Sequence, residues 1–171
     1  MRLFYALWPD TAVQRSLAAW GRDCHRVCGG RVVAAEMLHV TVAFLGEVAD
    51  DGYATLLEIG GSLGSAGFEL VFDRVAFWRH SGIVYASPSR IPEPLAALAL
   101  VLSERLAGAG LRIEERPFAP HVTLLRNARR SPRDIGFAPV IWQAQALSLI
   151  ETLRQDGKHA YRVRESWTLF R

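Results

Sequence analysis

The sequence predicts an α+β fold, built as a single domain of two lobes. Segments with strand-like alternation are mixed with segments of helical periodicity, without the regular strand–helix order of a doubly wound sheet. A His-Val-Thr motif followed by apolar residues occurs at 39–41 and again 82 residues later, at 121–123. The length of 171 residues suits one folding unit. We therefore expect residues 1–171 to form two similar lobes, each contributing one His-x-Thr strand to a shared cleft.

In the first half of the chain we expect two strands and two helices. The apolar run Leu3–Trp8 indicates a strand, and Asp10 is placed to cap a helix from Thr11 to about Val27. A second strand is expected at about 37–45 and a second helix at about 50–63.

The second half is expected to be richer in strands. Two β-rich stretches cover 68–78 and 83–87, and the short break His80-Ser81-Gly82 between them indicates a hairpin. A helix at about 93–107 carries leucines on one face of a period near 3.6 residues. Further strands are expected at about 118–125, 144–152 and 161–170.

The composition is typical of a globular protein and excludes a disordered chain, with 50% hydrophobic and 22% charged residues. Of the 20 basic residues only Lys158 is lysine, and arginine suits phosphate recognition, although a GC-rich genome would give the same bias. The apolar stretch Leu3–Trp8 is too short for a signal peptide or a membrane span. We expect a cytoplasmic monomer that does not bind membranes.

The two cysteines are expected to be packing residues. Cys24 and Cys28 lie four apart in the first predicted helix, where the geometry is poor for a disulfide. Neighbouring His25 points about 100° away around the helix, so a metal site is not expected there.

In each motif, the histidine and threonine side chains are expected to lie on the same face of a strand. Residues two apart in a strand share a face, so His39 projects with Thr41, and His121 with Thr123. The same alternation predicts that Phe44 lies on the opposite, apolar face. Two copies at matching places are more telling than one, because a single histidine on a strand is most often a surface or hydrogen-bonded residue.

Two imidazoles across a cleft can divide acid–base work near neutral pH. Opening a cyclic phosphodiester needs a base for the attacking water and an acid for the departing sugar oxygen. The hydroxyls of Thr41 and Thr123 can donate hydrogen bonds to the phosphate oxygens. Neither motif carries Asp, Glu or Cys where a metal ligand would be needed, so neither a metal nor a cofactor is expected.

The two motifs with their flanks, and both ends of the chain, carry a resemblance to a known family. The matching segments are Arg2-Leu3-Phe4, Leu38 to Glu47 (LHVTVAFLGE), Pro120 to Arg126 (PHVTLLR), and Tyr161 with Trp167-Thr168-Leu169. They resemble the two-histidine phosphoesterases, in particular the bacterial and archaeal RNA 2′,3′-cyclic phosphodiesterases of the 2′-5′ RNA ligase family. Paired motifs with these flanks are specific for the family, whereas either motif alone is not.

The resemblance implies a bilobal fold of two pseudo-symmetric halves, with antiparallel-rich sheets lining a central groove and helices outside. It also implies hydrolysis of RNA 2′,3′-cyclic phosphate ends to 2′-phosphomonoesters, with His39 as proton donor and His121 as proton acceptor. Thr41 and Thr123 would then bind the substrate phosphate.

Arg126 matches the arginine that follows the second motif in the family, and it is a further candidate for phosphate binding. It lies five residues after His121, so a regular strand would point it to the opposite face. Either the strand bends there or Arg126 is structural.

Two other functions remain open. One is the same chemistry on a small cyclic nucleotide, of the ADP-ribose cyclic phosphate type. The other is a non-catalytic module that binds RNA ends. Weak ligase activity is also compatible with the resemblance, because the reverse reaction uses the same acid–base pair.

Overall fold

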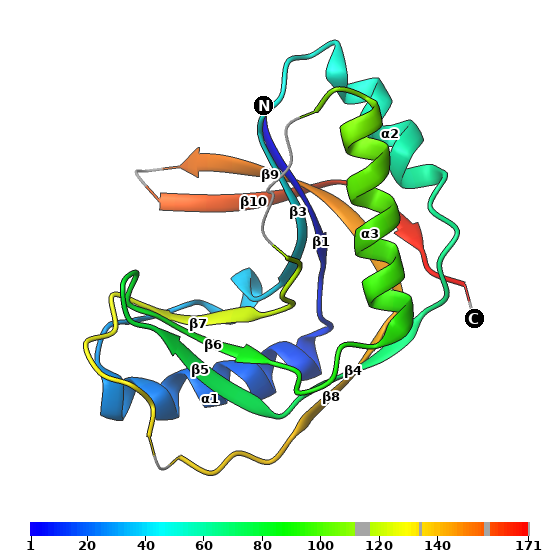
Figure 1. The fold of residues 1–171 in the computed structure, drawn as a ribbon. Helices are drawn as coiled ribbons and strands as arrows, with labels where there is room; N and C mark the ends of the chain where they lie inside the picture. The colour runs from blue at the N-terminus through cyan, green and yellow to red at the C-terminus, as the bar shows by residue number, and fades with distance from the viewer. Residues whose placement is uncertain (112–116, 134, 156–157, 171) are drawn as a thin grey trace.

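The computed structural model describes residues 1–111, 117–133, 135–155 and 158–170, which form an α+β fold of two lobes (Figure 1). The first lobe is a four-stranded antiparallel sheet in the order β10-β9-β1-β3. Its strands are β1 (Arg2–Leu7), β3 (Val40–Glu47), β9 (Ala146–Gln155) and β10 (Lys158–Thr168). This sheet combines strands from both ends of the chain, so the lobes are not successive halves of the sequence.

The second lobe contains a four-stranded antiparallel sheet in the order β2-β7-β6-β5, and a separate β4-β8 pair. Its strands are β2 (Arg31–Val32), β4 (Phe68–Phe72), β5 (Arg74–Trp78), β6 (Ile83–Ser87), β7 (Val122–Arg126) and β8 (Val140–Ala144). The motif strands β3 and β7 therefore belong to different lobes.

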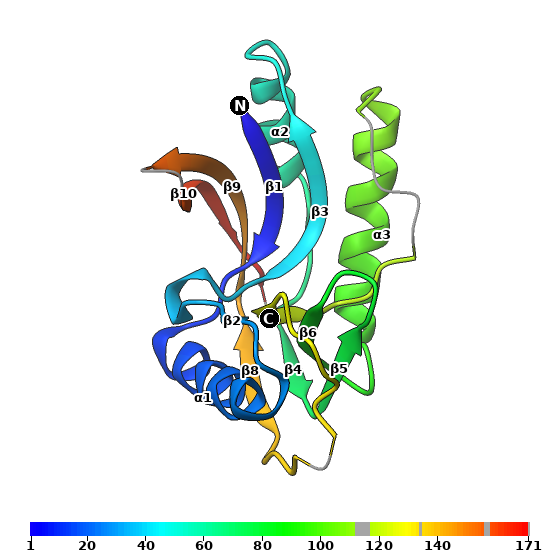
Figure 2. The same cartoon turned by 90° about the vertical axis from the view of Figure 1, so that its left-hand side faces the viewer.

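Helix α1 (Thr11–Cys28) lies along the second-lobe sheet, whereas α2 (Gly52–Gly61) and α3 (Glu93–Gly108) lie next to each other beside the first-lobe sheet (Figures 1 and 2). Helix α1 packs on β7, β2 and β8 of the second lobe, although it directly follows β1. Helices α2 and α3 pack against each other and contact β10 and β3 of the first lobe, respectively. In the described part of the chain, no helix combines the length and the apolar character that a membrane span requires.

Most of the predicted elements are confirmed. Helix α1 begins at Thr11, and the side chain of Asp10 accepts a hydrogen bond of 2.9 Å from the backbone N–H of Val13. The hairpin is also confirmed, because β5 and β6 pair from Trp78↔Ile83 onward. Strand β2 was not predicted. The stretch expected at 37–45 begins instead with a 3₁₀ turn, Ala35–Met37.

Both motif strands contain a β-bulge directly after the threonine. In the β1–β3 pair, Ala6 opposes Thr41 while Tyr5 opposes Ala43, so Val42 is an extra residue. In the β6–β7 pair, Tyr85 opposes Thr123 while Val84 opposes Leu125, so Leu124 is the extra residue there. A bulge reverses the alternation of side chains beyond it. Residues after each bulge therefore face the opposite way from a regular strand.

One cluster of buried side chains continues through both lobes, from Leu3, Tyr5 and Leu7 of β1 to Val122 and Leu124 of β7. Tyr5 is fully buried, and its hydroxyl donates a hydrogen bond of 2.6 Å to the carbonyl of Leu56 in α2. A buried hydroxyl without a hydrogen-bond partner would destabilise the fold, so this hydrogen bond stabilises the packing of β1 against α2. The two lobes thus share one core, and the single domain of residues 1–171 stays a prediction.

Candidate active site

His39 lies immediately before β3, with its ring oriented by the backbone. The preceding residue, Leu38, is extended, and the imidazole Nδ1 donates a hydrogen bond of 2.7 Å to the carbonyl of Met37. Because a carbonyl can only accept, Nδ1 carries the proton in the neutral ring. The other nitrogen, Nε2, is thus the atom that can take up or release a proton.

His121 repeats this arrangement in the second lobe. It lies immediately before β7, and its Nδ1 donates a hydrogen bond of 2.8 Å to the carbonyl of Ala119. The bond again spans two residues. Both motifs therefore hold their histidine in the same tautomer, in which Nδ1 carries the proton of the neutral ring and Nε2 does not.

Three aromatic rings surround His39. Trp8 is stacked on the imidazole, with ring centroids 5.0 Å apart and planes 3° from parallel. Phe4 lies at 5.1 Å in a tilted arrangement, and Tyr161 of β10 meets the ring edge-on at 5.2 Å. None of these three rings was predicted to lie next to His39. The available signal was that Phe4 and Trp8 lie four residues apart in the predicted strand Leu3–Trp8, so that period-two alternation puts both rings on one face.

His121 has an aromatic wall of its own. Trp78 of β5 lies 4.7 Å from the imidazole with planes 75° apart, and Tyr85 of β6 lies at 5.6 Å with planes 70° apart. The two rings also contact each other at 4.2 Å. Each histidine is thus held by a backbone bond and by neighbouring rings of its own lobe.

His39 is neutral in the free protein. The pKa of His39 is lowered from its usual 6.5 to about 4, mainly because burial disfavours the charged ring; the hydrogen bond to the Met37 carbonyl raises the pKa, and electrostatic interactions with Arg126 and His121 contribute to lowering it. Arg126 and His121 belong to the second lobe. These electrostatic interactions with His39 therefore act between the two lobes.

Arg126 lies at the end of β7 and on the side of the histidines. The bulge at Leu124 reverses the alternation, so both Leu124 and Leu125 are buried and Arg126 is exposed. The charge of Arg126 acts on His39 and also lowers the pKa of Tyr161, against the larger effect of burial, which raises it. Sequence analysis left open whether the strand bends before Arg126, and the bulge at Leu124 is such a bend. Binding of phosphate by Arg126 stays a prediction.

Thr41 and Thr123 are the paired residues of the motifs, and both are partly exposed. Each lies two residues after its histidine and before the bulge, where the regular alternation still holds. The two hydroxyls thus lie on the same side as the imidazoles. Their hydrogen bonds to a substrate phosphate stay predictions.

The prediction for Phe44 is wrong. Phe44 is 41% exposed and does not join the apolar face, because the bulge at Val42 turns it to the other side. The guanidinium of Arg2 lies 5.2 Å from the centre of its ring. Phe44 lies five residues after His39, as Arg126 lies five residues after His121. Each bulge therefore turns the fifth residue after the histidine to the same side as that histidine.

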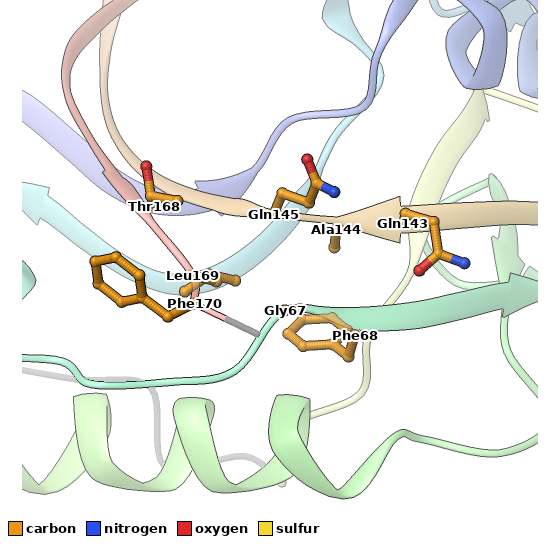
Figure 3. Close-up of a pocket in the computed structure, with 8 residues that line it drawn as sticks. All are labelled: Gly67, Phe68, Gln143, Ala144, Gln145, Thr168, Leu169 and Phe170. Atoms are coloured by element: carbon orange, nitrogen blue, oxygen red, sulfur yellow. The ribbon is translucent and has the colours of Figure 1, made fainter.

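A pocket of about 300 Å³ lies elsewhere, between the start of β4 and the end of β10 (Figure 3). It is lined by Gly67 and Phe68 together with residues 143–145 and 168–170, and none of the predicted site residues belongs to it. The described ranges also contain no group of three or more His, Cys, Asp or Glu side chains placed to hold a metal ion.

A protein-family model described as the 2′-5′ RNA ligase superfamily matches residues 9–161. The chain is 35% identical over 127 residues to the RNA 2′,3′-cyclic phosphodiesterase of Escherichia coli K12, a match covering 74% of this chain and 72% of that protein. It is 29% identical over 135 residues to the protein of the same name from Archaeoglobus fulgidus, covering 77% and 76% of the two chains.

Solved structures agree with these similarities. The crystal structure of E. coli LigT complexed with 3′-AMP superposes with a TM-score of 0.89 at 29% identity, covering 99% of this chain and 98% of that one. The same protein complexed with phosphate gives a TM-score of 0.84 at 28% identity, over the same shares of the two chains.

Proposed function

The chain belongs to the 2′-5′ RNA ligase superfamily, and we propose that it is an RNA 2′,3′-cyclic phosphodiesterase that hydrolyses cyclic phosphate ends to 2′-phosphomonoesters. The observation that carries the proposal is the matched pair of histidines, each donating Nδ1–H to the carbonyl two residues before it. Two such imidazoles can supply an acid and a base for ring opening, and the proposed reaction uses no metal.

In the proposed mechanism, His121 Nε2 accepts a proton from the attacking water and His39 Nε2–H protonates the departing 3′ oxygen. Water attacks phosphorus, the bond from phosphorus to the 3′ oxygen breaks, and the phosphate stays on the 2′ oxygen. The proton taken up by His121 and the proton released by His39 balance, so both return to their starting states by exchange with solvent.

The donor role requires His39 to be protonated when substrate is bound. Its pKa of about 4 in the free protein keeps it neutral near pH 7. A cyclic phosphodiester is an anion, and an anion next to an imidazole favours the charged form. We propose that the substrate itself promotes proton uptake by His39, since the phosphate charge offsets the effects of Arg126 and of burial.

Thr41 and Thr123 are proposed to donate hydrogen bonds to the non-bridging phosphate oxygens, where charge accumulates in the transition state. Arg126 is proposed to add positive charge beside them, which its electrostatic influence on His39 supports. The protein is proposed to act as a single-domain monomer in the cytoplasm. Ligation, the reverse reaction, is expected to be weak, because water is the far more abundant nucleophile.

The test is incubation of the protein with an oligoribonucleotide that ends in a 2′,3′-cyclic phosphate, in the presence of EDTA, with identification of the phosphomonoester formed. A 2′-phosphate is expected. A 3′-phosphate would contradict the proposed leaving group, and a requirement for added metal would contradict the acid–base scheme. If His39→Ala and His121→Ala both kept full activity, the catalytic assignment would be wrong.

A further inference from the structure

Arg31 and Arg126 stand directly opposite each other across the β2–β7 pair, at the edge of the second-lobe sheet. Both are exposed, and among the described residues no carboxylate forms an ion pair with either one. Like charges opposite each other destabilise an antiparallel pair. A purely structural role therefore does not explain why two arginines occupy these positions.

The arginine pair faces the site. Opposite residues of an antiparallel pair project from the same face of the sheet, with Cβ atoms about 4.5–5.5 Å apart. Arg126 acts electrostatically on His39 and Tyr161, which both belong to the first lobe. Arg31 shares the face of Arg126, so its guanidinium extends the positive charge away from the histidines toward the sheet edge.

The backbone holds Arg31 in this place. Gly30 has φ of +84°, and a Cβ on Gly30 would lie 2.6 Å from the carbonyl oxygen of Arg126 and 2.8 Å from the backbone nitrogen of Ala128. The N–H of Ala128 in turn donates a hydrogen bond of 2.8 Å to the carbonyl of Gly82. The backbone at Gly30 thus packs closely against the backbone of residues 126–128. A side chain at position 30 would prevent this close contact.

We propose that Arg31, together with Arg126, binds a second phosphate of the RNA: the 5′ phosphodiester of the nucleotide whose cyclic phosphate lies between the histidines. The inference rests on the proposed function. Guanidinium groups bind phosphate through paired N–H donors, and one phosphate between two arginines offsets their repulsion. The 5′ phosphodiester is the anion of the substrate next in the chain to the reacting group.

The consequence is a preference for RNA over small cyclic nucleotides. A nucleoside 2′,3′-cyclic phosphate with a free 5′ hydroxyl offers only the reacting phosphate, so it leaves Arg31 without a ligand. An oligoribonucleotide with the same terminal nucleoside offers both phosphates. Arg31 thus acts as a residue for substrate selection, separate from the acid–base pair.

The experiment compares kcat/KM for these two substrates in the wild type, in Arg31→Ala, and in the control Arg15→Ala. Arg15 is an exposed arginine on α1, so its loss changes the net charge equally. Arg31→Ala is expected to lower kcat/KM for the oligoribonucleotide about tenfold, the size of one charge-assisted hydrogen bond. It should leave the nucleoside substrate unchanged, which also shows that the variant is folded.

Salt dependence gives a second readout. The negative slope of log kcat/KM for the oligoribonucleotide against log salt concentration is expected to become shallower by about 0.7 in Arg31→Ala, as for the loss of one phosphate contact to a single strand. Arg15→Ala is expected to keep the wild-type slope. An equal loss on both substrates, or no loss on either, would overturn the assignment of Arg31.

Failure of the proposed function can be distinguished from failure of the Arg31 assignment, because the wild type would then hydrolyse neither cyclic phosphate substrate. Binding of the same oligoribonucleotide, carrying a fluorescent label and measured by anisotropy, then tests Arg31 alone. Weaker binding in Arg31→Ala, with no change in Arg15→Ala, supports the phosphate site. Equal binding by all three proteins would overturn it.

Discussion

Lowering the pH is expected to destabilise the protein through His39. The pKa of His39 is about 4 in the folded protein, against 6.5 in an unfolded chain, because folding removes the ring from water. Between these two values the unfolded state binds a proton that the folded state does not. The contribution of His39 to the free energy of unfolding is therefore complete above pH 6.5 and is lost as the pH falls toward 4.

The magnitude follows from the size of the shift. One unit of pKa difference corresponds to about 1.4 kcal/mol, so the shift from 6.5 to about 4 corresponds to roughly 3 kcal/mol. His39 is partly exposed, and water at its edge reduces the effect, so a loss of about 2–3 kcal/mol is expected. Since a domain is stable by only about 5–15 kcal/mol, this loss is large enough to measure.

Urea unfolding of the wild type and of His39→Asn at several pH values between 7 and 4 measures this contribution. Asparagine keeps an N–H donor near the position of Nδ1 and does not titrate, so the variant can retain the bond to Met37. Other titrating groups largely cancel in the difference between the two proteins. The wild type should lose about 2–3 kcal/mol relative to His39→Asn over this range. A difference that stays constant with pH would refute the neutral, buried state of His39.

Three further predictions concern the site and its support. His39→Ala and His121→Ala are each expected to lower kcat on a cyclic phosphate end by about 10²–10⁴, measured at saturating substrate; a smaller loss would contradict general acid–base catalysis. Thr123→Val is expected to lower kcat by about 10-fold to 100-fold with little change of KM, as for loss of a donor to a charged oxygen. Gly30→Ala is expected to destabilise the fold by about 1–3 kcal/mol in urea unfolding, since φ is +84° and the added Cβ would meet the Arg126 carbonyl.

Local signals in the sequence were sufficient for much of the fold. The capping residue Asp10 and the apolar periodicity after it predicted α1, and the turn residues after Trp78 predicted the β5–β6 hairpin. The packing of α1 on the second lobe was not predictable in this way. Periodicity identifies the apolar face of a helix, but it does not say which sheet covers that face.

The candidate site was predictable where the motif itself repeats. His39, Thr41, His121 and Thr123 were found because the same three-residue pattern occurs twice. Outside the repeat, Arg126 was named with its orientation left open, and Phe44 was placed on the wrong side. An extra residue in a strand leaves no mark on the pattern of apolar residues, because Val42 and Leu124 are as apolar as residues of a regular strand. Arg31 was missed because β2 has only two residues and is defined by its partner β7.

The two motifs are alike in sequence, in the backbone bond of the histidine and in the bulge after the threonine, so none of these features distinguishes an acid from a base. A difference in charge appears five residues after each histidine, where the first lobe has Phe44 and the second has Arg126. A charged arginine acts across the site on His39, whereas a phenyl ring has no charge with which to act on His121. We therefore propose that Arg126, together with the burial of His39, contributes to the unequal roles assigned to the two histidines.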